Sequence, residues 1–78
     1  KEEMPEGSYT TTLFERGADH IAQKVIEEAG ETALAAASGA SDRATSEAAD
    51  LLYHLTVLLE DSGIPLNDVA EELVRRRR

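Results

Sequence analysis

Residues 21–36 read IAQKVIEEAGETALAA, and residues 46–59 read SEAADLLYHLTVLL. These two stretches decide the fold, because in each of them apolar or small residues recur at the three- and four-residue spacing of one helical face. The expected apolar stripe of the first stretch consists of Ile21, Val25, Ala29, Thr32 and Ala36. The expected apolar face around the second stretch consists of Ala44, Ala48, Leu51, Leu52, Leu55, Leu58 and Leu59. The pattern predicts two long amphipathic helices.

Turn-forming residues divide the rest of the chain. Gly17, Gly39 and Gly63 stand where helices are expected to end, and Pro65 follows the last of them. The predicted helices cover residues 8–16, 19–38, 42–61 and 66–76, with Ser41 as the N-cap of the third. Because no strand pattern interrupts them, the fold class is all-α, with two long antiparallel helices and two short ones.

The ends and surfaces of this arrangement carry further expectations. Residues 1–7 are polar, contain proline and glycine, and are predicted to form a flexible lead or linker before a domain over residues 8–78. In the last helix, the expected buried side is Val69, Leu73 and Val74. Two long helices leave one leucine-rich face poorly covered, so we expect a homodimer with a core resembling a four-helix bundle.

Composition excludes several classes of function. Sixteen acidic residues oppose eight basic ones, and four of the basic ones are residues 75–78. A nucleic-acid partner is not expected, because such partners need a basic face and none exists outside this tail. No apolar run approaches the roughly 20 residues of a membrane span. The chain has no cysteine, which excludes disulfides and thiolate zinc sites and fits a reducing compartment.

Two acidic clusters indicate a metal site. Glu28 and Glu31 are three residues apart, as are Glu47 and Asp50. On a helix such residues are neighbours, and like charges at this spacing destabilise it. In a helical hairpin the two pairs can face each other, and carboxylates together with substrate phosphates commonly hold Mg²⁺. The alternative is that the acids pair with basic residues of a partner chain, although basic residues are scarce here.

The order of these motifs resembles a known group of enzymes. The pattern E-E-x-x-E followed by E-x-x-D is similar to the signature of the MazG-like all-α nucleoside triphosphate pyrophosphohydrolases. The segments SYTTTLFERG (8–17), IAQKVIEEAGETALAA (21–36), SEAADLLYHLTVLL (46–59) and GIPLNDVAEELVRR (63–76) resemble the phosphoribosyl-ATP pyrophosphohydrolase family within that group. Ile26 departs from the family pattern, which has a small residue there, and this affects packing rather than chemistry.

The resemblance implies an activity and roles for the acids. It implies Mg²⁺-dependent hydrolysis of phosphoribosyl-ATP to phosphoribosyl-AMP and pyrophosphate, the second step of histidine biosynthesis, in the cytoplasm. Glu28, Glu31, Glu47 and Asp50 match the metal-binding carboxylates, and Glu27 matches a catalytic acid that orients water or binds metal. The family also occurs fused behind a phosphoribosyl-AMP cyclohydrolase, and residues 1–7 would suit the linker of such a fusion.

Four further residues are candidates for substrate binding, each with a simpler alternative. Lys24 suits a substrate phosphate or a pairing with Glu28 one helical turn away. Tyr9 belongs to the matching segment SYT, and its alternative role is docking of the first helix. His54 lies one turn after Asp50, and its alternative is a structural, hydrogen-bonded histidine. Arg75 can reach substrate phosphates across a dimer, and like the other terminal arginines it also suits the C-terminus of a helix electrostatically.

Other functions are compatible with the same residues. A housecleaning nucleotide pyrophosphatase of the same superfamily would use the same acids on different substrates. A non-catalytic helical dimerisation module would leave them solvated. A di-iron bundle is disfavoured, because such sites use Glu-x-x-His and no histidine here follows a glutamate by three residues.

Overall fold

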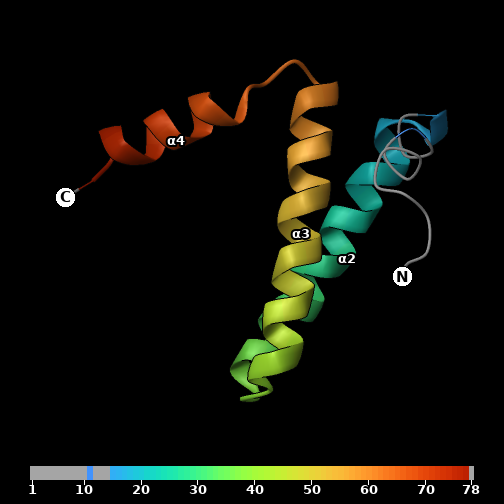
Figure 1. Ribbon diagram of the computed structural model, residues 1–78, viewed down its shortest axis with the longest axis vertical. Helices are drawn as coiled ribbons and strands as arrows, with labels where there is room; N and C mark the ends of the chain where they lie inside the picture. The colour runs from blue at the N-terminus through green and yellow to red at the C-terminus, as the bar shows by residue number, and fades with distance from the viewer. Residues whose placement is uncertain (1–10, 12–14, 78) are drawn as a thin grey trace.

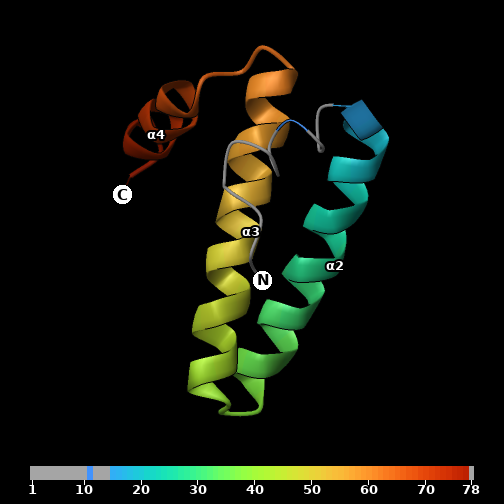
Figure 2. The same cartoon turned by 45° about the vertical axis from the view of Figure 1, so that its right-hand side comes forward.

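The architecture is a helical hairpin followed by a short third helix. A computed structural model of the chain describes residue 11 and residues 15–77. Its helices are α2 (Ala18–Ala37), α3 (Ser41–Asp61) and α4 (Leu66–Arg75). Helices α2 and α3 run antiparallel side by side, whereas α4 leads away from the far end of α3 (Figures 1 and 2). The described residues contain no strand, and the predicted all-α class is confirmed.

The predicted helix ends are close to the observed ones. Both ends of α2 lie one residue earlier than predicted, and α4 ends one residue earlier. The predicted N-cap of α3 is wrong: Ala40 takes that position without a side-chain hydrogen bond, and Ser41 is already helical. The predicted helix over residues 8–16 lies mostly outside the described residues, of which Thr11, Glu15 and Arg16 are helical.

Glycine-centred turns end both long helices. At the end of α2, Gly39 has φ +84°, its N–H donates to the carbonyl of Ala36, and the N–H of Ala40 donates to the carbonyl of Ala35. This pair of bonds is the Schellman motif, which needs a left-handed residue that glycine supplies without a Cβ penalty. Residues 59–64 repeat the motif around Gly63. The first turn folds α2 back onto α3 through a three-residue connection.

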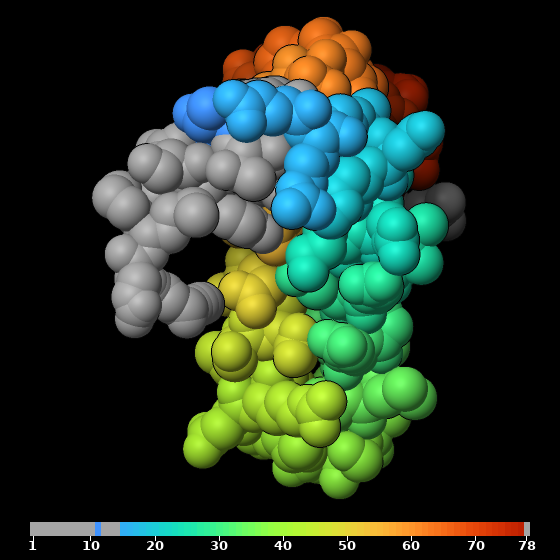
Figure 3. Space-filling view, turned by 90° about the vertical axis from the view of Figure 1, so that its right-hand side faces the viewer, coloured from blue at the N-terminus to red at the C-terminus, as the bar shows by residue number. Residues whose placement is uncertain are grey.

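The core of the hairpin is small and partly polar. Among the described residues, the buried apolar side chains are Ile21, Ala35 and Val57, and the buried polar ones are Glu28 and His54. Tyr53 and Leu58 pack against Ile21 and Val57 at the partly buried edge of this core. Figure 3 shows α2 and α3 in contact along the side of the molecule down to their connecting turn.

The orientation of α2 differs from the expected one. Its buried residues are Ile21, Glu28 and Ala35, which recur every seven residues. Ala29 and Ala36, which were expected on the apolar stripe, are exposed. A seven-residue repeat is the seam of two helices packed lengthwise. In this orientation, Glu28 of the predicted acidic stripe lies within the interface between α2 and α3, rather than at the border of that interface.

Many large apolar side chains remain uncovered in the single chain. Leu52 of α3 is 62% exposed, and Leu73 of α4 is 67% exposed. The expected burial of Val69, Leu73 and Val74 is therefore wrong within one chain, because α4 touches only the end of α3. The radius of gyration is 14.0 Å, compared with about 11.5 Å for a compact domain of this length. A single chain thus leaves apolar helix faces without a partner.

We expect Ile21→Ala to destabilise the chain by about 3 kcal/mol, because it removes the fully buried side chain of the core. Ile26→Ala is the matched control in the same helix, since Ile26 is 71% exposed, and its effect should stay within about 0.5 kcal/mol. Urea unfolding followed by circular dichroism measures both values. Equal losses at the two positions would contradict this assignment of the core.

Candidate functional site

The two predicted acidic clusters meet across the hairpin. Glu31 of α2 and Glu47 of α3 are close enough for their carboxyl groups to share a proton. This contact is the main cause that raises the pKa of Glu47. Partial desolvation and the charges of Glu31 and Asp50 raise the pKa of Glu47 further, and Arg43 opposes them. The carboxylates therefore repel one another at neutral pH, and a bound cation would relieve that repulsion.

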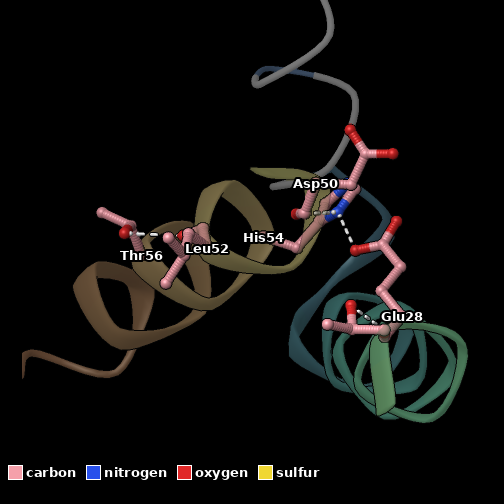
Figure 4. A network of polar contacts seen from close by, with 6 residues as sticks. Glu28, Asp50, Leu52, His54 and Thr56 are labelled. Atoms are coloured by element: carbon pink, nitrogen blue, oxygen red, sulfur yellow. Dashed lines mark hydrogen bonds and ion pairs between the residues drawn. The ribbon is translucent and has the colours of Figure 1, made fainter. Parts of the chain in front are cut away.

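A second contact ties the buried acid of α2 to α3. The Oε1 atom of Glu28 lies 2.6 Å from Nδ1 of His54. The same ring nitrogen lies 3.0 Å from the backbone carbonyl oxygen of Asp50. A backbone carbonyl only accepts hydrogen bonds, so Nδ1 carries the proton and donates to both oxygens. Figure 4 shows the ring nitrogen of His54 between Glu28 and the backbone of Asp50, with both contacts dashed.

The acids have the oxygen ligands that a hard cation prefers, but they do not form a complete metal-binding site by themselves. Within the described part of the chain, no three His, Asp or Glu side chains are gathered closely enough to hold a metal ion. Mg²⁺ keeps several waters and often takes only one or two protein carboxylates together with substrate phosphates. The oxygen-only donor set of Glu31, Glu47 and Asp50 matches that chemistry. The carboxylate oxygen of Glu28 that does not contact His54 is a further oxygen donor of the same kind.

The other predicted site residues lie at different distances from this cluster. Glu27 is exposed, and its carboxylate accepts a hydrogen bond from the side chain of Gln23 at 3.2 Å. Lys24 is half-buried and makes no ion pair with Glu28, which binds His54 instead. Arg75 is exposed on α4, where it pairs with Glu72, and Tyr9 lies outside the described residues.

The pairing of Glu28 with His54 is the feature that the sequence patterns did not identify. The signal that indicates it is the register of the hairpin. Glu28 stands eleven residues before Gly39, and Asp50 stands eleven residues after it. An antiparallel pair closing at Gly39 therefore places Glu28 opposite the helical turn that contains Asp50 and His54.

Comparison with known proteins identifies the family. Residues 1–77 match the family model described as phosphoribosyl-ATP pyrophosphohydrolase. The chain belongs to this family. The family resemblance of the sequence motifs is thereby confirmed, and the match includes both acidic pairs.

Three named relatives are identical to this chain at about half of the aligned positions. This chain is 51% identical over 76 residues to the phosphoribosyl-ATP pyrophosphatase of Metallosphaera sedula, and the aligned residues make up 97% of this chain and 82% of that protein. It is 55% identical over 75 residues to the histidine biosynthesis bifunctional protein HisIE of Bacteroides thetaiotaomicron, covering 96% of this chain. The HisIE protein of Shewanella oneidensis is 51% identical over the whole chain. The chain spans 37% of the length of each of these two bifunctional relatives.

The helices of this family member differ from membrane-spanning helices. In the parts of the chain that the structure describes, none is long and apolar enough to cross a bilayer.

We expect Glu47→Gln to stabilise the metal-free chain at neutral pH. A carboxyl whose pKa is raised on folding favours the folded state below its unfolded pKa, and this contribution is lost as pH rises through the folded pKa. At pH 7 the ionised Glu47 therefore weakens the hairpin, and glutamine removes the repulsion. Melting temperatures in a chelating buffer should rise at pH 7, with the gain disappearing below about pH 4, where wild-type Glu47 is protonated.

The control for that measurement is Glu71→Gln, which removes one exposed acid from the middle of α4. It changes the net charge equally, but it leaves the facing acids intact. An equal gain from Glu71→Gln at pH 7 would show that overall charge, rather than the contact with Glu31, destabilises the chain.

Proposed function

We propose that the chain hydrolyses phosphoribosyl-ATP to phosphoribosyl-AMP and pyrophosphate with Mg²⁺, the second step of histidine biosynthesis. The observation that carries the proposal is the contact of Glu31 with Glu47, two acids from different helices whose proximity raises the pKa of Glu47. Family membership and the name of the Metallosphaera sedula relative support the choice of substrate. The cytoplasm is the compartment proposed for this activity.

Phosphate chemistry explains why acids gather where a negative substrate must bind. Transfer of a phosphoryl group spreads charge over its oxygens, so catalysis rests on positioning and electrostatic stabilisation. A divalent cation supplies neutralisation of that charge when it is bound. Glu31, Glu47 and Asp50 would hold it, together with the outer oxygen of Glu28.

The residues around the acids have separate proposed tasks. Glu27, exposed beside the cluster on α2, would accept a proton from the attacking water and orient it. Lys24 would bind a substrate phosphate, because within the described part of the chain its ammonium group is not engaged by an acid. Arg75 lies on α4, away from the hairpin (Figure 1), and would reach a substrate only at the site of a neighbouring chain.

We expect Glu31→Gln to lower the rate of phosphoribosyl-ATP hydrolysis by about 100-fold or more, because it removes one charge from the proposed metal site. Pyrophosphate release at saturating Mg²⁺ measures the rate. Glu71→Gln is the matched control and should retain the rate. The wild-type activity should disappear in a chelating buffer and return with added Mg²⁺.

The same assay separates the rival functions. A housecleaning pyrophosphatase would use the same acids, so a panel of ordinary and modified nucleotides is run beside phosphoribosyl-ATP. Faster hydrolysis of any of those nucleotides would reject the proposed substrate. Complete inactivity of the folded wild-type chain with Mg²⁺ would favour a non-catalytic dimerisation module.

A homodimer is the proposed assembly. The exposed apolar residues lie on all three described helices, and a second chain would cover helix faces that one chain leaves bare. In the bifunctional relatives the corresponding unit is part of a longer protein. We therefore also propose that this unit acts beside a phosphoribosyl-AMP cyclohydrolase, either fused to it or as a separate partner.

We expect the wild-type chain to sediment as a dimer and Leu52→Lys to shift it toward monomer, because Leu52 is a large apolar side chain that is 62% exposed on α3. Ser46→Lys adds the same charge at another exposed position of α3 and serves as the control. Analytical ultracentrifugation at several concentrations measures both variants. A wild-type monomer at every concentration would contradict the proposed assembly.

A further inference from the structure

The most constrained acid of the hairpin is Glu28. Its residue exposure is 8%, and that of its partner His54 is 4%. A carboxylate is rarely buried unless its oxygens are hydrogen-bonded. The short contact from His54 Nδ1 to Glu28 Oε1 satisfies one of the two carboxylate oxygens.

The histidine ring is itself held in place. Its Nδ1 proton is shared with the backbone carbonyl of Asp50, one turn earlier in the same helix. The imidazole ring also packs against the ring of Tyr53 in a T-shaped arrangement, with ring centroids 5.3 Å apart and an interplanar angle of 71°. The position of Glu28 Oε1 is therefore set by α3, although Glu28 belongs to α2.

Stability alone does not account for this pair. Replacing a buried ionic or polar pair by apolar residues is often neutral or stabilising, because desolvation offsets the attraction. Ile21, Ala35 and Val57 show that the same seam accepts apolar side chains. A buried acid in so small a core is better explained by a task for its second oxygen.

We propose that His54 is a positioning residue, which fixes one oxygen of Glu28 so that the other is presented to the divalent cation beside Asp50. This inference rests on the proposed metal-dependent function. Figure 4 shows the geometry: the second oxygen of Glu28 lies on the side toward which the Asp50 carboxylate extends. This positioning role differs from the substrate-binding role that the sequence predicted for His54. Hydrogen bonds of this kind orient metal-binding side chains in many sites.

The test is Mn²⁺ binding to the full chain without substrate, measured by the electron paramagnetic resonance signal of free Mn²⁺. In His54→Gln the amide nitrogen, which is the hydrogen-bond donor, lies where Nε2 of the histidine ring was and not where Nδ1 was. This variant should weaken Mn²⁺ binding by about 10-fold or more. His54→Asn keeps a donor at the Nδ1 position and should stay within about threefold of wild type. The pair is matched in polarity, so the comparison does not depend on an apolar variant that fails to fold.

Thr56→Val is the control on the same helix. The Thr56 hydroxyl donates only to the backbone carbonyl of Leu52 at 2.8 Å, away from Glu28 (Figure 4). This variant should bind Mn²⁺ as wild type does. Circular dichroism and melting temperatures record whether any loss of binding follows a loss of fold.

The outcomes separate the two proposals. If His54→Gln and His54→Asn are folded and bind Mn²⁺ equally well, the positioning role is rejected while the metal-dependent function stands. If the wild-type chain binds no Mn²⁺ and hydrolyses nothing, the proposed function is rejected and the positioning role with it. Weak binding by His54→Gln, with recovery in His54→Asn, supports the inference.

Discussion

A carboxylate placed between two packed helices needs a hydrogen-bond donor, and the contact of Glu28 with His54 meets that need. The contact lies in the seam that also holds Ile21, Ala35 and Val57. Because this core is small, the polar contact occupies a large share of the interface. It restricts both the rotation of α2 and its register along α3. The remaining acids keep their places only while that register holds.

Charge is distributed unevenly around this seam. The acids gather near the middle of the hairpin, whereas Arg75 and Arg76 are engaged by Glu72 on α4. Arg43 is the basic residue that offsets the charge of Glu47, and it does so only in part. The hairpin thus carries a local repulsion that a purely structural protein would have no reason to keep. Proteins commonly retain such destabilising arrangements where function requires them.

Sequence patterns were sufficient for local structure and for the meeting of the two acidic pairs, but not for the contacts inside the hairpin core. Gly39 and Gly63 mark the observed helix ends, because a left-handed turn strongly favours glycine. The two acidic pairs were identified because like charges at helical spacing need an explanation. The burial of Glu28 was not predicted, since hydropathy places a glutamate at a border, and only the partner helix reveals the donor. The exposure of Leu73 was missed because periodicity shows that a face is apolar without showing what covers it.

The turn at Gly39 also has a consequence for the order in which the molecule forms. Most residue contacts of the molecule lie within single helices. Across the hairpin, the separation grows from 16 residues for Glu31 and Glu47 to 26 residues for Glu28 and His54. Helical proteins rich in such local contacts fold on the microsecond to millisecond timescale, because little loop-closure entropy opposes them. Two helices that fold back at one glycine can therefore bring the acids together within a single chain. The proposed encounter with a second chain depends on concentration, whereas the contact of Glu31 with Glu47 lies within one chain. We would therefore expect the acid cluster to assemble before the proposed dimer rather than to be created by it.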